Sequence, residues 1–151
     1  MNLLQKDTAD LTKALCGTPP AQLHSWLEAT FAEGELSFSR YMDALIAQKG
    51  MKRQDIIIKA NLPQKYGYKL LSGETHTTDR DKILRLCFSM QLTLQQTQRA
   101  LKLYGMSELY AKVRRDALLI CALNARICDI DRVNELLAAE KLPPLYSEDA
   151  R

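Results

Sequence analysis

Apolar residues recur at helical spacing along most of this chain. A clear run comprises Phe38, Tyr41, Met42, Leu45 and Ile46, and it ends at Lys49-Gly50. Side chains three and four positions apart share one face of a helix, so this run predicts an amphipathic helix. β-branched residues rarely alternate with polar ones, and there are only 6 glycines and 5 prolines. The pattern predicts an all-α protein.

Capping residues and helix breakers divide this pattern into separate helices. Thr18, Thr78 and Thr93 each precede an apolar run and are the expected N-caps, while Gly17, Gly34, Gly73 and Gly105 are expected to end helices. In the second expected helix, Leu23, Trp26, Leu27 and Phe31 form an apolar stripe, and Trp26 is expected to pack in a core. The expected helices cover about residues 2–16, 19–33, 37–49, 53–60, 64–71, 79–90 and 94–104, followed by a helical hairpin.

A repeat links the middle of the chain to its C-terminal part. Arg80-Asp81 and the apolar positions after it recur 35 residues later at Arg115-Asp116, and Leu109-Tyr110 recurs 36 residues later as Leu145-Tyr146. Two successive hairpins of one design that stack along a shared apolar seam would explain this match. We therefore expect four parts: an N-terminal helical segment (1–36), a central domain (37–104), a C-terminal helical extension (105–146) and a flexible tail (147–151).

The formal charge of +3 is unevenly distributed. Residues 1–36 and 129–151 each carry a net −3, whereas residues 37–69 carry +5 and residues 70–128 carry +4. The strongest excess falls on two short expected helices joined by Asn61-Leu62-Pro63, where Asp55 is the only acid between residues 51 and 73. A short helix pair with cations and amides outward suits insertion of one helix into the DNA major groove.

From Ser37 to Leu101 the chain resembles the five-helix DNA-binding domain of lambda-repressor-like (XRE-family) bacterial regulators. The resemblance rests on the Lys49-Gly50 turn, a second helix from Arg53 to Ala60, the sharp turn at Asn61-Leu62-Pro63, and a recognition helix from Gln64 that Ser72-Gly73 ends. It implies a helix-turn-helix transcriptional regulator that binds double-stranded DNA.

The resemblance also implies which residues meet DNA. Gln64 and Lys65 would face the groove floor, where Gln suits adenine and Lys suits guanine. Lys52 and Arg53 would meet phosphate at the start of the second helix. Thr75 and Thr77 are further possible phosphate contacts. The full set of expected DNA-binding residues is Lys52, Arg53, Gln64, Lys65, Tyr68, Lys69 and His76.

Two substitutions in the helix pair depart from the family pattern. Gly67 stands where a large aliphatic residue is common, and Ile57 stands where a small residue is common. We expect Gly67 to allow close helix approach and Tyr66 and Tyr68 to fill the space beside it. If a tyrosine were exposed beside Leu71, that face would suit a protein partner. The alternative function is thus an interaction module on a helix-turn-helix scaffold that no longer binds DNA.

The C-terminal helices offer a second large apolar surface, which could form a homodimer, bind a protein partner or pack back on the domain. We expect most of it to pack back. Lys112, Arg114 and Arg115 cluster at a helix start, where a cation opposes the helix dipole, so we expect a tie to an acid such as Asp116 or to an anion.

Other function classes find little support in the sequence. No carboxylate pair, nucleophile with a base or Gly-rich phosphate loop is present, so we expect no enzyme activity and no cofactor. The 4 cysteines form no C-x-x-C pair, and His24 and His76 are isolated, which predicts reduced thiols and no metal site. No apolar run is long enough for a membrane span and no signal peptide begins the chain, so we expect a cytoplasmic protein.

Overall fold

The computed structural model describes residues 17, 19–25 and 37–145. The chain divides into two compact units, Met1–Ser37 and Phe38–Arg151. In the first unit the described residues include the short 3₁₀ helix η2 (Pro20–Gln22), whose first turn begins with proline. The helix expected over 2–16, the Thr18 cap and the position of Trp26 lie outside the described residues.

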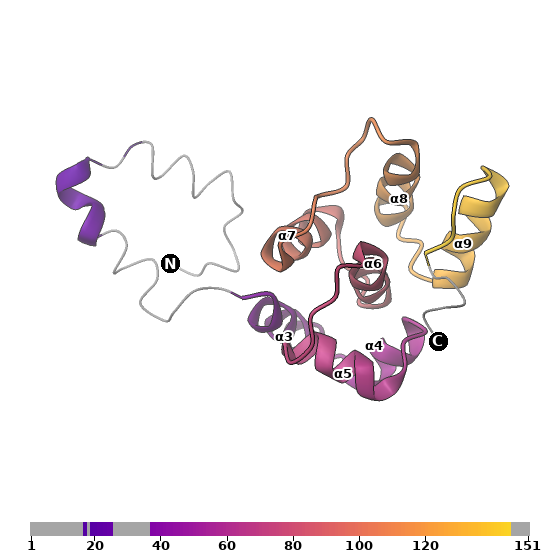
Figure 1. The fold of residues 1–151 in the computed structure, drawn as a ribbon, viewed down its shortest axis with the longest axis horizontal. Helices are drawn as coiled ribbons and strands as arrows, with labels where there is room; N and C mark the ends of the chain where they lie inside the picture. The colour runs from indigo at the N-terminus through magenta and orange to yellow at the C-terminus, as the bar shows by residue number, and fades with distance from the viewer. Residues whose placement is uncertain (1–16, 18, 26–36, 146–151) are drawn as a thin grey trace. The chain divides into compact units, whose positions relative to one another are not determined.

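Over its described residues, 38–145, the regular secondary structure of the second unit is helical (Figure 1). They are α3 (Phe38–Lys49), α4 (Arg53–Lys59), α5 (Gln64–Ser72), α6 (Arg80–Ser89), α7 (Leu94–Tyr104), α8 (Arg114–Asn124) and α9 (Ile130–Ala139). With η2 included, the described residues form eight helices and no strand, which confirms the all-α prediction. Across the same residues, no helix has both the length and the apolar character that crossing a membrane requires.

Six of these helices end in the same way. A residue with positive φ follows the helix, and the next residue is apolar and donates its backbone N–H five residues back along the chain. This geometry satisfies carbonyls that the helix end leaves free and turns the chain toward the core. The positive-φ residues are Gly50, Asn61, Gln91, Gly105, Arg126 and Lys141, and the apolar residues after them are Met51, Leu62, Leu92, Met106, Ile127 and Leu142.

The helix starts agree with the sequence in one case and differ in another. Thr93 and Gln96 form a reciprocal capping box at the start of α7, as expected for a Thr followed three residues later by Gln. The predicted cap at Thr78 is wrong, because Asp79 accepts the Asp81 N–H at the start of α6. The Asp79 carboxylate also lies at the positive end of the helix dipole, which favours it over a hydroxyl.

Helix α6 lies at the centre of the second unit (Figure 1). Residues 83–90 are all buried, and α6 packs against α4, α7 and α9. This stretch is mostly apolar, with Arg85 and Ser89 as its polar members, and a helix buried on nearly every side is stable only where other elements surround it. The core therefore forms around α6, and α4–α5 and α8–α9 both pack against this central helix.

Burial has a chemical consequence for Cys87 in α6. The thiol is fully buried, and desolvation raises its pKa to about 12, although a hydrogen bond with Thr97 opposes the shift. Because the thiolate is the nucleophile, Cys87 should be inert in the folded protein. On treatment with a maleimide at neutral pH, we expect Cys121, which is exposed, to be modified rapidly and Cys87 only after unfolding. Peptide mass spectrometry checks this, and equal rates at the two thiols would contradict it.

Helices α4 and α5 cross very closely at Gly67. A Cβ atom added there would lie 2.5 Å from Cγ2 and 2.8 Å from Cγ1 of Ile57, which is fully buried. The expectation that Gly67 allows close approach is confirmed. The expectation that Tyr66 and Tyr68 fill the space is wrong, because Ile57 fills it. At this crossing α4 supplies the large residue, Ile57, and α5 supplies the small one, Gly67.

The α8–α9 hairpin packs back on the rest of the unit, as expected. Helix α8 contacts α7, and α9 contacts α6. Two of the three cations in the basic cluster at the start of α8 are tied to acids, but their partners differ from the predicted one: Arg115 binds Asp81, and Arg114 binds Glu140. Asp116 binds Arg80 of α6, and not a cation of the cluster.

Candidate nucleic-acid interface

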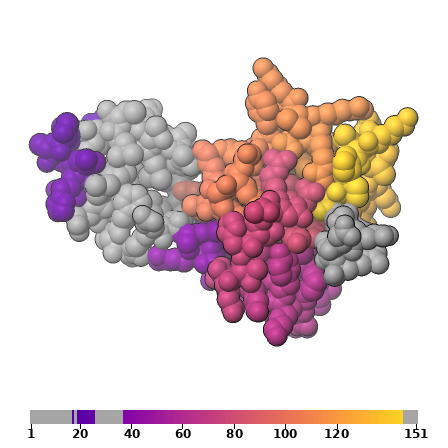
Figure 2. Space-filling view, in the orientation of Figure 1, coloured from indigo at the N-terminus to yellow at the C-terminus, as the bar shows by residue number. Residues whose placement is uncertain are grey.

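One face of α5 is uncovered and polar. Gln64, Lys65, Tyr68 and Ser72 are exposed, and at about 100° per residue they occupy an arc of about 100° around the helix. Figure 2 shows the magenta surface of α4 and α5 at the lower edge of the second unit. The described part of the C-terminal extension does not cover these side chains.

The charge on α5 is of one sign. Lys65 is exposed and Lys69 half-buried, one turn apart, and the helix contains no acidic residue from Gln64 to Ser72. Among the described residues, no ion pair or hydrogen bond engages either ammonium group. Both cations are therefore available to an anionic partner without first breaking a contact.

Three contacts fix the position of α5. Leu70 and Leu71 are fully buried on the inner side, and Gly67 rests against Ile57. On its flank, Lys82 of α6 lies 4.9 Å from the Tyr66 ring centroid and 3.4 Å from the Tyr66 hydroxyl. Tyr66 is therefore half-buried and held, whereas Tyr68 stays 37% exposed on the outer face. The helix is thus a rigid support for its polar face.

The two basic residues predicted to meet phosphate differ in their availability. Lys52 immediately precedes α4 and is exposed. Arg53 is also exposed but forms an ion pair with Asp43 of α3, with 2.5 Å between Nη2 and Oδ1. A guanidinium has five N–H donors, so this pair leaves Arg53 able to bind a second acceptor while orienting it.

The loop after α5 is fixed by Tyr104 of α7. The Tyr104 hydroxyl accepts the Thr77 N–H at 2.7 Å, and its ring stacks on His76 at 4.4 Å between centroids. Burial raises the Tyr104 pKa, which the Thr77 hydrogen bond partly offsets. His76 is exposed, so a contact to phosphate is open to it. Thr77 is buried and its hydroxyl accepts the Asp79 N–H, so the suggestion that it contacts phosphate is wrong.

Two residues of this region escaped the sequence analysis. Ser72 lies on the same face as Tyr68, one turn further along α5, and helical spacing alone could have identified it. Lys82 supports Tyr66 from another helix, and no local pattern in the sequence indicates that contact.

Chemistry other than binding finds few candidates here. In the described ranges, no three His, Cys, Asp or Glu side chains gather where they could hold a metal ion. The uncovered side chains of α5 present an amide (Gln64), a cation (Lys65), a phenol (Tyr68) and a hydroxyl (Ser72). Comparisons with protein-family models, with curated proteins and with solved structures find no match to this chain.

Proposed function

We propose that the protein is a DNA-binding transcriptional regulator that inserts α5 into the major groove. The single observation that carries this proposal is the uncovered α5 face formed by Gln64, Lys65, Tyr68 and Ser72, which has no carboxylate and is held rigidly from behind. Amide and ammonium groups are the donors and acceptors that read base edges, and a fixed helix keeps them in register.

The size of the helix pair supports the same function. Helix α5 extends from Gln64 to Ser72, and an α-helix with its side chains is about 10–12 Å in diameter, which fits a major groove about 12 Å wide. Helix α4 crosses behind it and places Lys52 and Arg53 near its own start. In a helix-turn-helix protein the first helix of the pair meets the backbone while the second reads bases. We assign phosphate contacts to Lys52, Arg53 and His76, and base contacts to Gln64, Lys65 and Lys69.

Reversing two charges on α5 is the direct test. We expect Lys65→Glu with Lys69→Glu to weaken binding to a specific duplex by about a hundredfold or more, because base contacts are worth about 1–3 kcal/mol each. The wild-type affinity should fall steeply between low and physiological salt, and this slope should be shallower in the variant. A selection of bound genomic fragments supplies the duplex, and fluorescence anisotropy measures the affinity at several salt concentrations.

A matched control keeps the change of net charge but moves it elsewhere. Lys112→Glu with Lys141→Glu alters two exposed cations outside α4 and α5 and should leave most of the affinity intact. Equal losses in the two double variants would show that only overall charge matters. An unchanged affinity in the α5 variant would remove the assignment of α5 to the groove.

A second candidate function is protein binding through the same helix pair. It is favoured by Ile58, which is 59% exposed on α4, and by Tyr68, which is 37% exposed on α5. Apolar and aromatic side chains at an interface centre contribute strongly to protein–protein affinity. Ile58→Ser separates the two functions. If the helix pair binds DNA, the variant should keep its affinity for the duplex. If the helix pair binds a protein, the variant should lose a large part of its affinity for that protein.

A further inference from the structure

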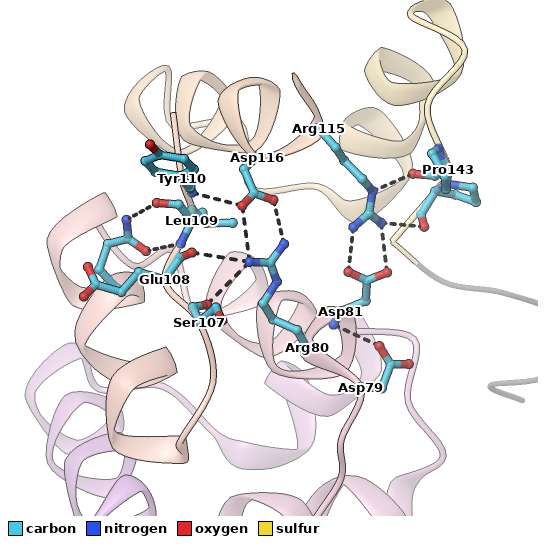
Figure 3. A network of polar contacts seen from close by, with 12 residues as sticks. Asp79, Arg80, Asp81, Ser107, Glu108, Leu109, Tyr110, Arg115, Asp116 and Pro143 are labelled. Carbon is cyan, nitrogen blue, oxygen red and sulfur yellow. Dashed lines mark hydrogen bonds and ion pairs between the residues drawn. The ribbon is translucent and has the colours of Figure 1, made fainter. Parts of the chain in front are cut away.

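Two Arg-Asp pairs lock the α6–α7 hairpin to the α8–α9 hairpin (Figure 3). At the start of α6, Arg80 binds Asp116, with Nη2 2.6 Å from Oδ1 and Nη1 3.2 Å from Oδ2. At the start of α8, Arg115 binds Asp81 through two contacts of 2.8 Å. Each hairpin therefore supplies one arginine and one aspartate, and it receives the same pair in return.

The same two arginines also hold the chain segment that leaves their own hairpin. Arg80 donates to the carbonyls of Ser107 and Glu108, and Arg115 donates to those of Pro143 and Pro144, which stand 36 residues further along. The two hairpins thus match in side-chain pairs and also in backbone contacts (Figure 3).

A third matched contact lies deeper in each hairpin. The side-chain amide oxygen of Gln98 accepts the Leu109 N–H at 2.7 Å, and that of Asn134 accepts the Leu145 N–H at the same distance. Leu109 and Leu145 are both buried. The positive-φ residues Gln91 and Arg126 also occupy equivalent places after α6 and α8. The repeat in the sequence is therefore a repeat of structure.

The way the hairpins pack identifies their symmetry. Helix α6 contacts α9, and α7 contacts α8. Exchanging the two hairpins turns the first contact into the second, which a two-fold rotation does and a simple translation along an array does not. Reciprocal contacts of this kind define an isologous interface, in which one surface is complementary to itself.

We propose that α8–α9 fills, within each chain, the site on α6–α7 that is complementary to the α6–α7 hairpin of a second copy. Arg80 and Asp81 supply one cation and one anion from the same hairpin. Two copies of α6–α7 could therefore pair through two ion pairs, each between Arg80 of one copy and Asp81 of the other. The chain is therefore an internal pseudo-dimer. One consequence rests on the proposed function. A chain closed in this way does not dimerise through α6–α7, so it brings a single α5 helix to DNA and reads a site without two-fold symmetry.

The covalent link decides which partner occupies the face. Residues 105–113 connect α7 to α8 and are anchored at Leu109 and at the Tyr110 N–H, which Asp116 accepts. A short link gives the attached hairpin an effective concentration in roughly the millimolar range. At micromolar concentrations a second copy cannot compete, and the closed chain prevails.

Exchanging the charges of one hairpin tests this inference without DNA. In the variant Arg115→Asp with Asp116→Arg, like charges face Arg80 and Asp81, so α8–α9 is repelled while α6–α7 keeps its own pair. By sedimentation velocity from micromolar to near-millimolar concentration, we expect a monomer for the wild type and a concentration-dependent dimer for this variant. Adding Arg80→Asp with Asp81→Arg restores opposite charges across the hairpins and should restore the monomer.

Each outcome bears on the proposal. The proposal would be overturned if the wild type were a dimer and Arg80→Ala dissociated it. It would also be overturned if the charge-exchanged variant were helical by circular dichroism yet monomeric at every concentration. If that variant loses its helices, Asp116→Asn replaces it, and a monomer at the highest concentration then counts against the proposal. Failure of DNA binding leaves these sedimentation results unaffected, so the two proposals fail separately. With a selected duplex, one wild-type chain should bind per site with a Hill coefficient near one.

Discussion

Combining Ile57→Ala with Gly67→Leu should cost much less stability than the two single substitutions predict when added. Gly67→Leu alone forces a side chain into space that Ile57 occupies, and such overpacking costs about 1–3 kcal/mol or more. Ile57→Ala alone empties a fully buried site and costs about 2–5 kcal/mol. Together they exchange the large and the small residue, so we expect a favourable coupling of about 2–3 kcal/mol in urea unfolding.

The control for this cycle pairs Gly67→Leu with a cavity in another helix. Leu123→Ala in α8 removes a similar buried side chain that does not line the α4–α5 crossing. Its cost should add to that of Gly67→Leu, because separated sites behave independently. If the Ile57 cycle is also additive, the two residues do not share one space, and the account of the crossing is wrong.

The crossing also governs the proposed function. Gly67 lies within α5, between the exposed Lys65 and Tyr68, so a side chain that pushes α5 away from α4 would tilt the uncovered face. Gly67→Leu should therefore weaken DNA binding even under conditions where the protein remains folded. The exchange variant should recover part of that affinity together with its stability, since it restores the separation of the two helices.

The features best predicted from the sequence are those that depend on local signals. The ends of α3, α5 and α7 at Lys49, Ser72 and Tyr104 follow directly from a glycine after each helix and from apolar residues at helical spacing. Such signals depend on neighbours in the chain, so they survive folding unchanged. The same spacing identified the uncovered side of α5 but overlooked Ser72.

Contacts between distant segments could not be predicted in the same way. The sequence showed that Arg80-Asp81 and Arg115-Asp116 repeat. It did not show whether each arginine binds its neighbouring aspartate, remains in solvent or binds the aspartate of the other hairpin. Only the two-fold packing of the hairpins settles that Arg80 binds Asp116 and Arg115 binds Asp81. The Tyr104–Thr77 hydrogen bond, which removes Thr77 from the candidate DNA contacts, likewise joins residues 27 positions apart.

Removing the Asp116 carboxylate should be among the most destabilising single changes in the second unit. This side chain is nearly fully buried and accepts from both Nη atoms of Arg80 and from the Tyr110 N–H. Asp116→Ala leaves the Arg80 guanidinium with only its contacts to the Ser107 and Glu108 carbonyls, and it leaves the Tyr110 N–H without its acceptor. Breaking a fully buried pair costs about 3–5 kcal/mol, which is the upper bound here because the Arg80 side chain is 26% exposed, and this is a large part of a typical total stability of about 5–15 kcal/mol.

The comparison with an exposed ion pair separates burial from charge. Arg114–Glu140 has a similar distance, 2.9 Å, but its side chains are 72% and 55% exposed. Because solvent screens this pair, Arg114→Ala should cost less than about 1 kcal/mol. Removing Arg80 together with Asp116 should cost less than the sum of the two single changes, since neither leaves the other charge stranded. Equal losses for Asp116→Ala and Arg114→Ala in urea unfolding would mean that the reciprocal pairs do not hold the two hairpins together.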